Sequence, residues 1–180
     1  MMIQMLSRRL PKFHDILPVY AIIAFMVYGW TLVTYLRYLQ YWLQFLNIGE
    51  ILAIFCYSML ADLVESLIIL LVLLALCWLL PARFLKDMFV VRGALFTICV
   101  LGSILVFLNN FPDLDAYGNM AWPWTAATIL ASALISFFAA KLGFVGKAMK
   151  WLSDSMIIFL YIFIPVTALS FFVVLVRNIA

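Results

Sequence analysis

The stretch IGEILAIFCYSMLADLVESLIILLVLLALCWLLP, residues 48–81, decides the fold of this chain. After Glu50 its only charged residues are Asp62 and Glu65. A helix needs about 20 mainly apolar residues to cross a bilayer, and this run exceeds that length. Pro81 ends it, because proline has no amide proton with which to continue the helix. The stretch therefore predicts a membrane-spanning helix over residues 50–80.

The rest of the chain has the same character. Of its 180 residues, 69% are hydrophobic and 11% are charged, and a water-soluble domain of this size cannot bury so much apolar surface. We predict an all-α, polytopic integral membrane protein with five transmembrane helices in a single membrane domain, residues 16–180, after a cytoplasmic segment 1–15. The spans are expected at 16–36, 50–80, 93–108, 123–140 and 155–176, with an interfacial segment at 37–48 that is rich in tyrosine, tryptophan and glutamine.

The basic residues predict the orientation. Nine of the 11 lysines and arginines fall on one side of the membrane if there are five spans, and only Arg37 and Arg177 fall on the other. Short cytoplasmic loops carry such an excess, so we expect the N-terminus in the cytoplasm and the C-terminus outside, in the plasma or inner membrane of the cell. The nine residues are Arg8, Arg9, Lys12, Arg83, Lys86, Arg92, Lys141, Lys147 and Lys150.

The most informative polar feature is the pair Asp62 and Glu65. Residues three apart share one face of a helix, and carboxylates in hydrocarbon are costly unless they meet a cation, a cavity or a positive side chain. The run from Ser66 to Leu80 covers about 22 Å, which places the pair in the outer part of the membrane. Contact with a partner protein, or a structural role, is the first interpretation. Binding of a proton or a cation is the alternative.

Three weaker features complete the list of candidates. Asp113 and Asp115 imitate the start of a calcium loop, but Trp124 stands where the ligating glutamate is needed, so an acidic turn is the ordinary interpretation of this weak metal site. Pro165 predicts a kink in the last span. Small residues at helical spacing on the fourth span predict a surface that packs against another helix, within the chain or in a partner: Ala127, Thr128, Ala131, Ser132, Ser136 and Ala140.

Catalytic patterns are missing from the sequence. It has no phosphate-binding glycine loop, no HExxH and no Gly-x-Ser-x-Gly, and it contains a single histidine. We expect neither an enzyme nor a cofactor, and no nucleic acid, since the net charge of +3 reflects topology. The sequence favours a non-catalytic membrane subunit or anchor that packs in the bilayer against another membrane protein or a second copy. The alternative is a small proton- or cation-coupled transporter or channel that uses Asp62 and Glu65.

Overall fold

Long α-helices make up nearly all of the chain that the computed structural model describes, which is residues 11–79, 88–111 and 114–179. These ranges contain no strand, so the all-α prediction is confirmed for them. Five helices are long and apolar enough to span a membrane, as the sequence predicted. They are α2 (Phe13–Phe45), α3 (Ile48–Leu79), α5 (Phe89–Asn110), α6 (Leu114–Ala139) and α7 (Gly143–Ile179).

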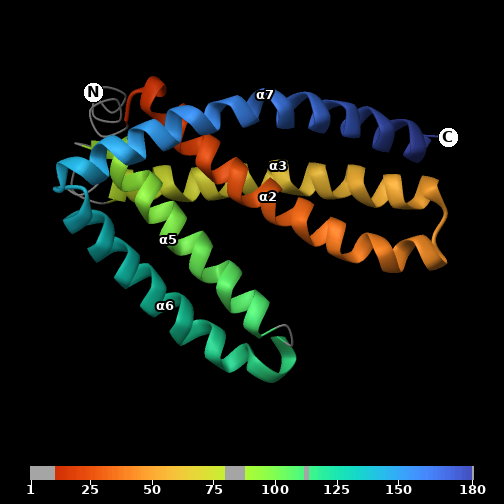
Figure 1. Cartoon of the computed structure of the whole chain (residues 1–180), viewed down its shortest axis with the longest axis horizontal. Helices are drawn as coiled ribbons and strands as arrows, with labels where there is room; N and C mark the ends of the chain where they lie inside the picture. Colours follow the sequence, from red (N-terminus) through yellow and green to blue (C-terminus); the bar gives the residue numbers. More distant parts are fainter. Residues whose placement is uncertain (1–10, 80–87, 112–113, 180) are drawn as a thin grey trace.

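The helices form a three-helix bundle with a hairpin attached to it (Figure 1). Helices α2, α3 and α7 contact one another, and α5 packs against α2 and α7. Within the described chain, α6 makes its extensive contacts with α5 alone. The α5–α6 hairpin therefore leaves the bundle at an angle, and α5 is the wall that the two parts share (Figure 1).

Helix α2 continues past Arg37, where the sequence placed the end of the first span. It runs without interruption to Phe45, and the amide of Leu46 donates a 2.8 Å hydrogen bond to the carbonyl of Trp42. No proline or glycine lies between Arg37 and Phe45 to break the helix. The residues predicted to lie at the interface, 37–48, are thus mostly the last turns of α2.

A short turn joins α2 to α3. The amide of Asn47 donates a 2.9 Å hydrogen bond to Oε2 of Glu50, which is the third residue of α3. This contact is one half of a capping box, in which an acidic side chain satisfies an amide that the helix itself leaves without a partner. Glu50 is thereby a helix-capping residue.

All five helices begin before the positions that the sequence indicated, and the difference is largest for α6 and α7. Helix α6 starts at Leu114, so Pro123 lies inside it, and α7 starts at Gly143, before Lys147 and Lys150, which were expected in a turn. A proline removes only one helical hydrogen bond, and charged side chains are compatible with a helix that extends beyond the apolar core. Hydropathy marks the apolar part of such helices and not their ends. Helix α7 also continues through Pro165, and its ribbon is bowed in Figure 1.

Two clusters of buried side chains hold the bundle together. One lies where α2, α3 and α5 meet and includes Val19, Ile23, Leu73 and Phe89. The other joins α2, α3 and α7 through Ala24, Tyr28, Met59 and Leu160. Helix α2 contributes to both, so it is the central helix of the fold.

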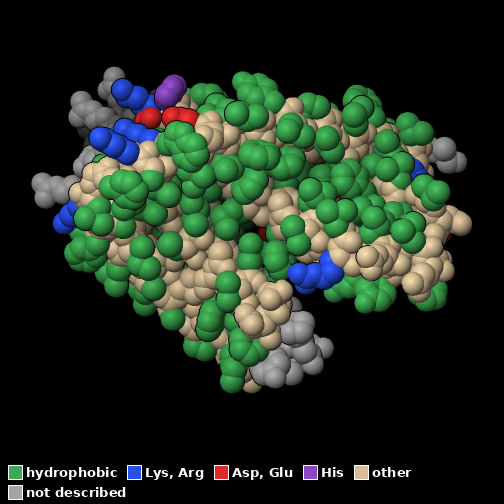
Figure 2. Space-filling view, in the orientation of Figure 1, with side chains coloured by type: hydrophobic (Ala, Val, Ile, Leu, Met, Phe, Trp, Pro, Cys, Tyr) green, Lys and Arg blue, Asp and Glu red, His purple; other side chains and the backbone are tan. Residues whose placement is uncertain are grey.

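The outer surface of the molecule is apolar. Large hydrophobic side chains on every helix are exposed, among them Leu71 on α3, Leu130 on α6 and Phe172 on α7. Figure 2 shows such side chains over most of the visible face, with lysine and arginine gathered mainly at the end where α2 and α7 begin. Water is a poor solvent for a surface of this kind, whereas lipid chains suit it.

Gly93 provides a test of the packing between α5 and the bundle. A Cβ atom at this position would lie 3.5 Å from both Cγ atoms of Val19 and 3.7 Å from Leu73 Cδ2. We expect Gly93→Ala to be tolerated and Gly93→Leu to destabilise the fold by about 1–3 kcal/mol, because a larger side chain has to displace these neighbours. Reversible unfolding in mild detergent measures the difference.

The matched control for this substitution is Gly102→Leu. Gly102 is also in α5, and a Cβ atom there meets nothing within 4 Å. Both leucines gain the same helix propensity, so the difference between them isolates the packing cost. Equal stabilities for the two leucine variants would contradict the packing of α5 against α2 and α3.

Candidate functional site

Asp62 lies in the interior of the bundle. Its side chain is only 3% exposed, and Thr31 Oγ1 on α2 donates a 2.7 Å hydrogen bond to its Oδ1. The other carboxyl oxygen, Oδ2, is buried and has no hydrogen-bond partner among the described residues. Removing a carboxyl oxygen from water without such a partner costs free energy, so Oδ2 is a buried acceptor whose hydrogen bond the described residues do not supply.

Hydroxyl groups on α2 make further bonds to the neighbouring helices. The hydroxyls of Tyr28 and Thr167 on α7 lie 2.9 Å apart, and those of Tyr20 and Ser66 on α3 lie 3.4 Å apart. Together with Thr31 they form a polar seam along α2, made of hydroxyls that bond across helix interfaces.

Glu65 occupies a different environment from Asp62, although the two lie three residues apart. Asp62 lies on the buried face of α3, together with Met59 and Ser66. Glu65 lies about 60° away around the helix axis, given 3.6 residues per turn. Its side chain is exposed and lines a cavity of about 230 Å³ between α2, α3 and α5. Thr31 lines the same cavity and connects it to Asp62 through the hydrogen bond.

The carboxylate pair therefore consists of one enclosed group and one accessible group. Arg37 and Arg177 are the two basic residues predicted on the outer side of the membrane, where the carboxylate pair was also expected. Neither forms a salt bridge with Asp62 or Glu65 in the described structure. Enclosure by α2 prevents Asp62 from meeting a partner surface directly. Glu65 can meet a cation in the cavity.

The chain matches no protein-family model, no curated protein and no solved structure. Its site is therefore described from geometry and chemistry alone.

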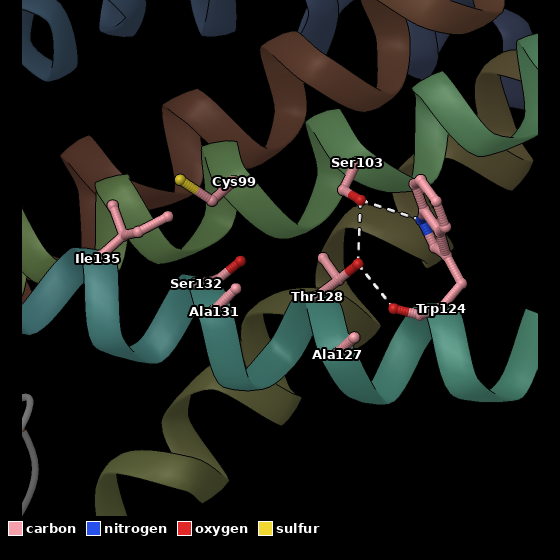
Figure 3. A pocket seen from close by; sticks show the side chains of 8 residues that line it. All are labelled: Cys99, Ser103, Trp124, Ala127, Thr128, Ala131, Ser132 and Ile135. Atoms are coloured by element: carbon pink, nitrogen blue, oxygen red, sulfur yellow. Dashed lines mark hydrogen bonds between the residues drawn. The ribbon is translucent and has the colours of Figure 1, made fainter.

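A second candidate site is the groove between α5 and α6 (Figure 3). The groove has a volume of about 450 Å³ and is open along one side. Hydroxyls cross it, since Ser103 Oγ lies 3.0 Å from Thr128 Oγ1 and accepts a 3.1 Å hydrogen bond from the indole nitrogen of Trp124. Its lining consists of Cys99, Ser103, Trp124, Ala127, Thr128, Ala131, Ser132 and Ile135.

The small-residue stripe of α6 divides between two surroundings. Ser132, Ser136 and Ala140 are buried, whereas Ala127 and Ala131 are exposed along the groove. Figure 3 shows Ser132 projecting toward α5. Buried members of the stripe such as Ser132 thus lie against α5, whereas Ala127 and Ala131 contact no other described helix closely enough to be covered.

The acidic pair near the start of α6 lies outside what the structure describes. Asp113 is not among the described residues, and of Asp115 only the backbone is described, within α6. Across residues 11–79, 88–111 and 114–179, no group of three or more histidine, cysteine or acidic side chains is arranged to hold a metal ion. The metal interpretation of Asp113 and Asp115 stays a prediction.

Sequence reasoning missed the residues that complete both sites. Thr31, Tyr20 and Tyr28 on α2 lie among apolar neighbours, and so does Ser103 on α5, so none of them forms a pattern along the chain. The indole nitrogen of Trp124 donates a hydrogen bond to Ser103 Oγ, a contact that no pattern along the chain indicated. One signal could have indicated Thr31. It is a hydroxyl residue in the span next to the one that carries Asp62, and such a residue can donate a hydrogen bond to the carboxylate.

Thr31→Val tests whether the hydrogen bond to Asp62 stabilises the bundle. Valine keeps the shape of threonine and removes the donor, so we expect a loss of about 1–2 kcal/mol, since an interhelical hydrogen bond is lost and a carboxyl oxygen is left unpaired. In an Asp62→Leu background the same substitution is expected to cost less than about 0.5 kcal/mol, because no acceptor remains. Reversible unfolding in detergent gives all four stabilities of this cycle.

The control is Thr34→Val, the same substitution one turn further along α2, which is expected to change stability by less than about 0.5 kcal/mol. If Thr31→Val costs as much with leucine at position 62 as with aspartate, the two side chains are not coupled.

Proposed function

We propose that this chain is a non-catalytic membrane subunit, or anchor, that packs against a partner membrane protein along the α5–α6 groove. The observation that carries the proposal is the incomplete packing of α6. In the most apolar window of α6 11% of the residues are buried, the lowest share among the five helices, whose other values run from 17% for α7 to 44% for α2. A helix that its own chain leaves so uncovered is free to contact a neighbour.

The chemistry of the groove supports a helix as that neighbour. Alanines 127 and 131 lie one turn apart and are exposed, and small residues at this spacing let two helices approach closely in lipid. The hydroxyls of Ser103 and Thr128 are on the same groove, and beside their bonds to each other and to Trp124 their oxygens can accept a hydrogen bond from a polar side chain of the partner. Acyl chains, in contrast, gain nothing from these hydroxyls.

We also propose that the N-terminus faces the cytoplasm, that the C-terminus lies outside and that the protein belongs to the cell membrane. Five of the described basic residues support this orientation, because α2, α5 and α7 begin, and α6 ends, at one end of the molecule (Figure 1). Cytoplasmic ends carry the excess of positive charge. The five residues are Lys12, Arg92, Lys141, Lys147 and Lys150.

Aromatic contacts support an interfacial position for this basic end. The guanidinium carbon of Arg92 lies 5.2 Å from the centre of the Phe137 ring, and Lys141 Nζ lies 4.8 Å from it. A phenylalanine flanked by two cations suits the boundary between hydrocarbon and headgroups, where apolar rings and hydrated charges meet.

Filling the groove tests the subunit proposal. We expect Ala131→Leu to reduce the amount of co-purified partner, or of a second copy, at least about tenfold, because leucine occupies the space that an approaching helix needs. The tagged full-length chain is purified from its native membranes in mild detergent, and the stoichiometry of bound protein is measured by mass spectrometry.

Ala133→Leu is the matched control, since Ala133 is also exposed on α6 but does not line the groove. It is expected to retain the partner. A monomer without any stoichiometric companion, or an equal loss in both leucine variants, would argue against docking along this groove.

Reporter fusions test the orientation. A green fluorescent protein at the N-terminus is expected to fluoresce, and one fused after residue 180 is expected to stay dark, because this reporter fails to fold when it is exported unfolded. Alkaline phosphatase, which is active only after export, is expected to show the reverse pattern. Fusion after Lys150, ahead of the last span, is the control and is expected to restore fluorescence. A fluorescent C-terminal fusion of the full chain contradicts the proposed topology.

A further inference from the structure

The cavity between α2, α3 and α5 has apolar walls and an acidic edge. Its volume is about 230 Å³, below the roughly 300–1,000 Å³ of sites for drug-sized ligands. Leucine, isoleucine, valine and methionine make up most of the wall, and Trp30, Thr31 and Glu65 supply its remaining side chains. Figure 2 shows a hollow in the surface between α2 and α5.

Negative charge at this cavity lacks a counter-charge. No lysine or arginine in residues 11–79, 88–111 or 114–179 forms a salt bridge with Glu65 or Asp62. Arg37, the described basic residue of α2 beyond the cavity, lies six positions after Thr31, which is about 9 Å along the helix axis. Behind Thr31, the buried Asp62 keeps one oxygen without a hydrogen-bond partner.

We propose that this cavity binds a small ammonium cation with apolar substituents, of quaternary or tertiary type. The carboxylate of Glu65 supplies the opposite charge, and the hydrocarbon walls receive the substituents. Trp30 also lines the cavity, and an indole ring attracts a cation of this kind through its ring electrons. Thr31 also donates a hydrogen bond to the enclosed carboxyl of Asp62, which joins the site to the interior of the bundle.

The small number of side-chain oxygens in the cavity favours a ligand that needs few hydrogen-bond acceptors. A calcium or magnesium ion requires six or more oxygen ligands, whereas the cavity lining has only the Glu65 carboxylate and the Thr31 hydroxyl as side-chain oxygens. A primary ammonium group carries three donors, all of which need partners away from water. A quaternary ammonium group carries no N–H, so one carboxylate and an aromatic face are enough.

This ligand site is independent of the subunit role. The cavity touches Leu101, Ile104, Leu105 and Leu108 of α5, whereas the groove proposed for partner docking touches Cys99 and Ser103 of the same helix. Substitutions in one place therefore leave the other intact, and failure of one proposal is distinguishable from failure of the other.

Calorimetric titration of the purified full chain in maltoside micelles tests the inference. The probes are choline and 3,3-dimethylbutan-1-ol, which has the same shape with carbon in place of the charged nitrogen. Choline is expected to bind saturably and at least about tenfold more tightly than the alcohol, because only the cation interacts with Glu65. Equal binding of the two probes, or no saturable binding of choline, overturns the proposal.

Variants assign the binding to this cavity. Glu65→Gln is expected to weaken choline binding at least about tenfold, and because Glu65 is exposed, the variant is expected to keep the unfolding temperature of the parent. Trp30→Leu is expected to weaken it as well. Glu50→Gln is the matched control, since Glu50 is on the same helix and caps its start, and it is expected to bind choline like the parent. Unchanged binding in Glu65→Gln, or an equal loss in Glu50→Gln, refutes the site.

A quaternary ammonium group can come from a lipid headgroup or from a free cation, and adding lipid to the micelles distinguishes the two. Doping the micelles with phosphatidylcholine is expected to weaken choline binding by competition if the natural ligand is a lipid headgroup, whereas phosphatidylglycerol at the same mole fraction is the control. Unchanged affinity with phosphatidylcholine assigns the site to a free cation. Both results keep the cavity as an ammonium site.

Discussion

Polar groups that leave water inside a membrane must find their partners within the protein, and in this chain helix α2 supplies hydroxyl partners to three buried polar residues of α3 and α7. Its hydroxyls at Tyr20, Tyr28 and Thr31 reach Ser66 and Asp62 on α3 and Thr167 on α7. Apolar packing alone does not hold helices in register in lipid, because lipid chains are equally apolar. The hydroxyl contacts of α2 thus define how the three long helices face each other, and the position of α5 follows from its packing on α2.

The same rule explains why the two carboxylates of α3 are not equivalent. Asp62 stands on the stripe that faces α2, so it is enclosed and shares a hydrogen bond with Thr31. Glu65 stands at the edge of that stripe, where α5 diverges from α3 and a cavity remains. One group contributes to the cohesion of the bundle and leaves an oxygen unsatisfied, and the other presents its charge to whatever enters the cavity. This difference gives the acidic pair its chemical interest.

Helix α5 separates the two features on which the functional proposals rest. Leu101, Leu105 and Leu108 recur at helical spacing and face the cavity, and Cys99 and Ser103 face the groove that α6 forms. A ligand in the cavity and a partner helix on the groove would therefore contact different residues of this one helix. The hairpin leaves the bundle at an angle, with α6 held mainly by α5, so the groove belongs to the hairpin and the cavity to the junction of α5 with the bundle (Figure 1).

The sequence by itself determined the all-α class and the number of long apolar helices, because apolar composition and the roughly 20-residue span length are local properties of the chain. It also singled out Asp62 and Glu65, since charged residues are conspicuous in an apolar run. The sequence predicted the helix ends less well. Helix α6 begins at Leu114, before Pro123, and α7 begins at Gly143, because the helices continue where hydropathy falls. Only the tertiary structure decided that Asp62 is enclosed with Thr31 while Glu65 lines a cavity with Trp30, and that Ser103 meets Thr128 and Trp124. These contacts join residues on different helices, and their geometry depends on how the helices cross, which no periodicity along one helix records.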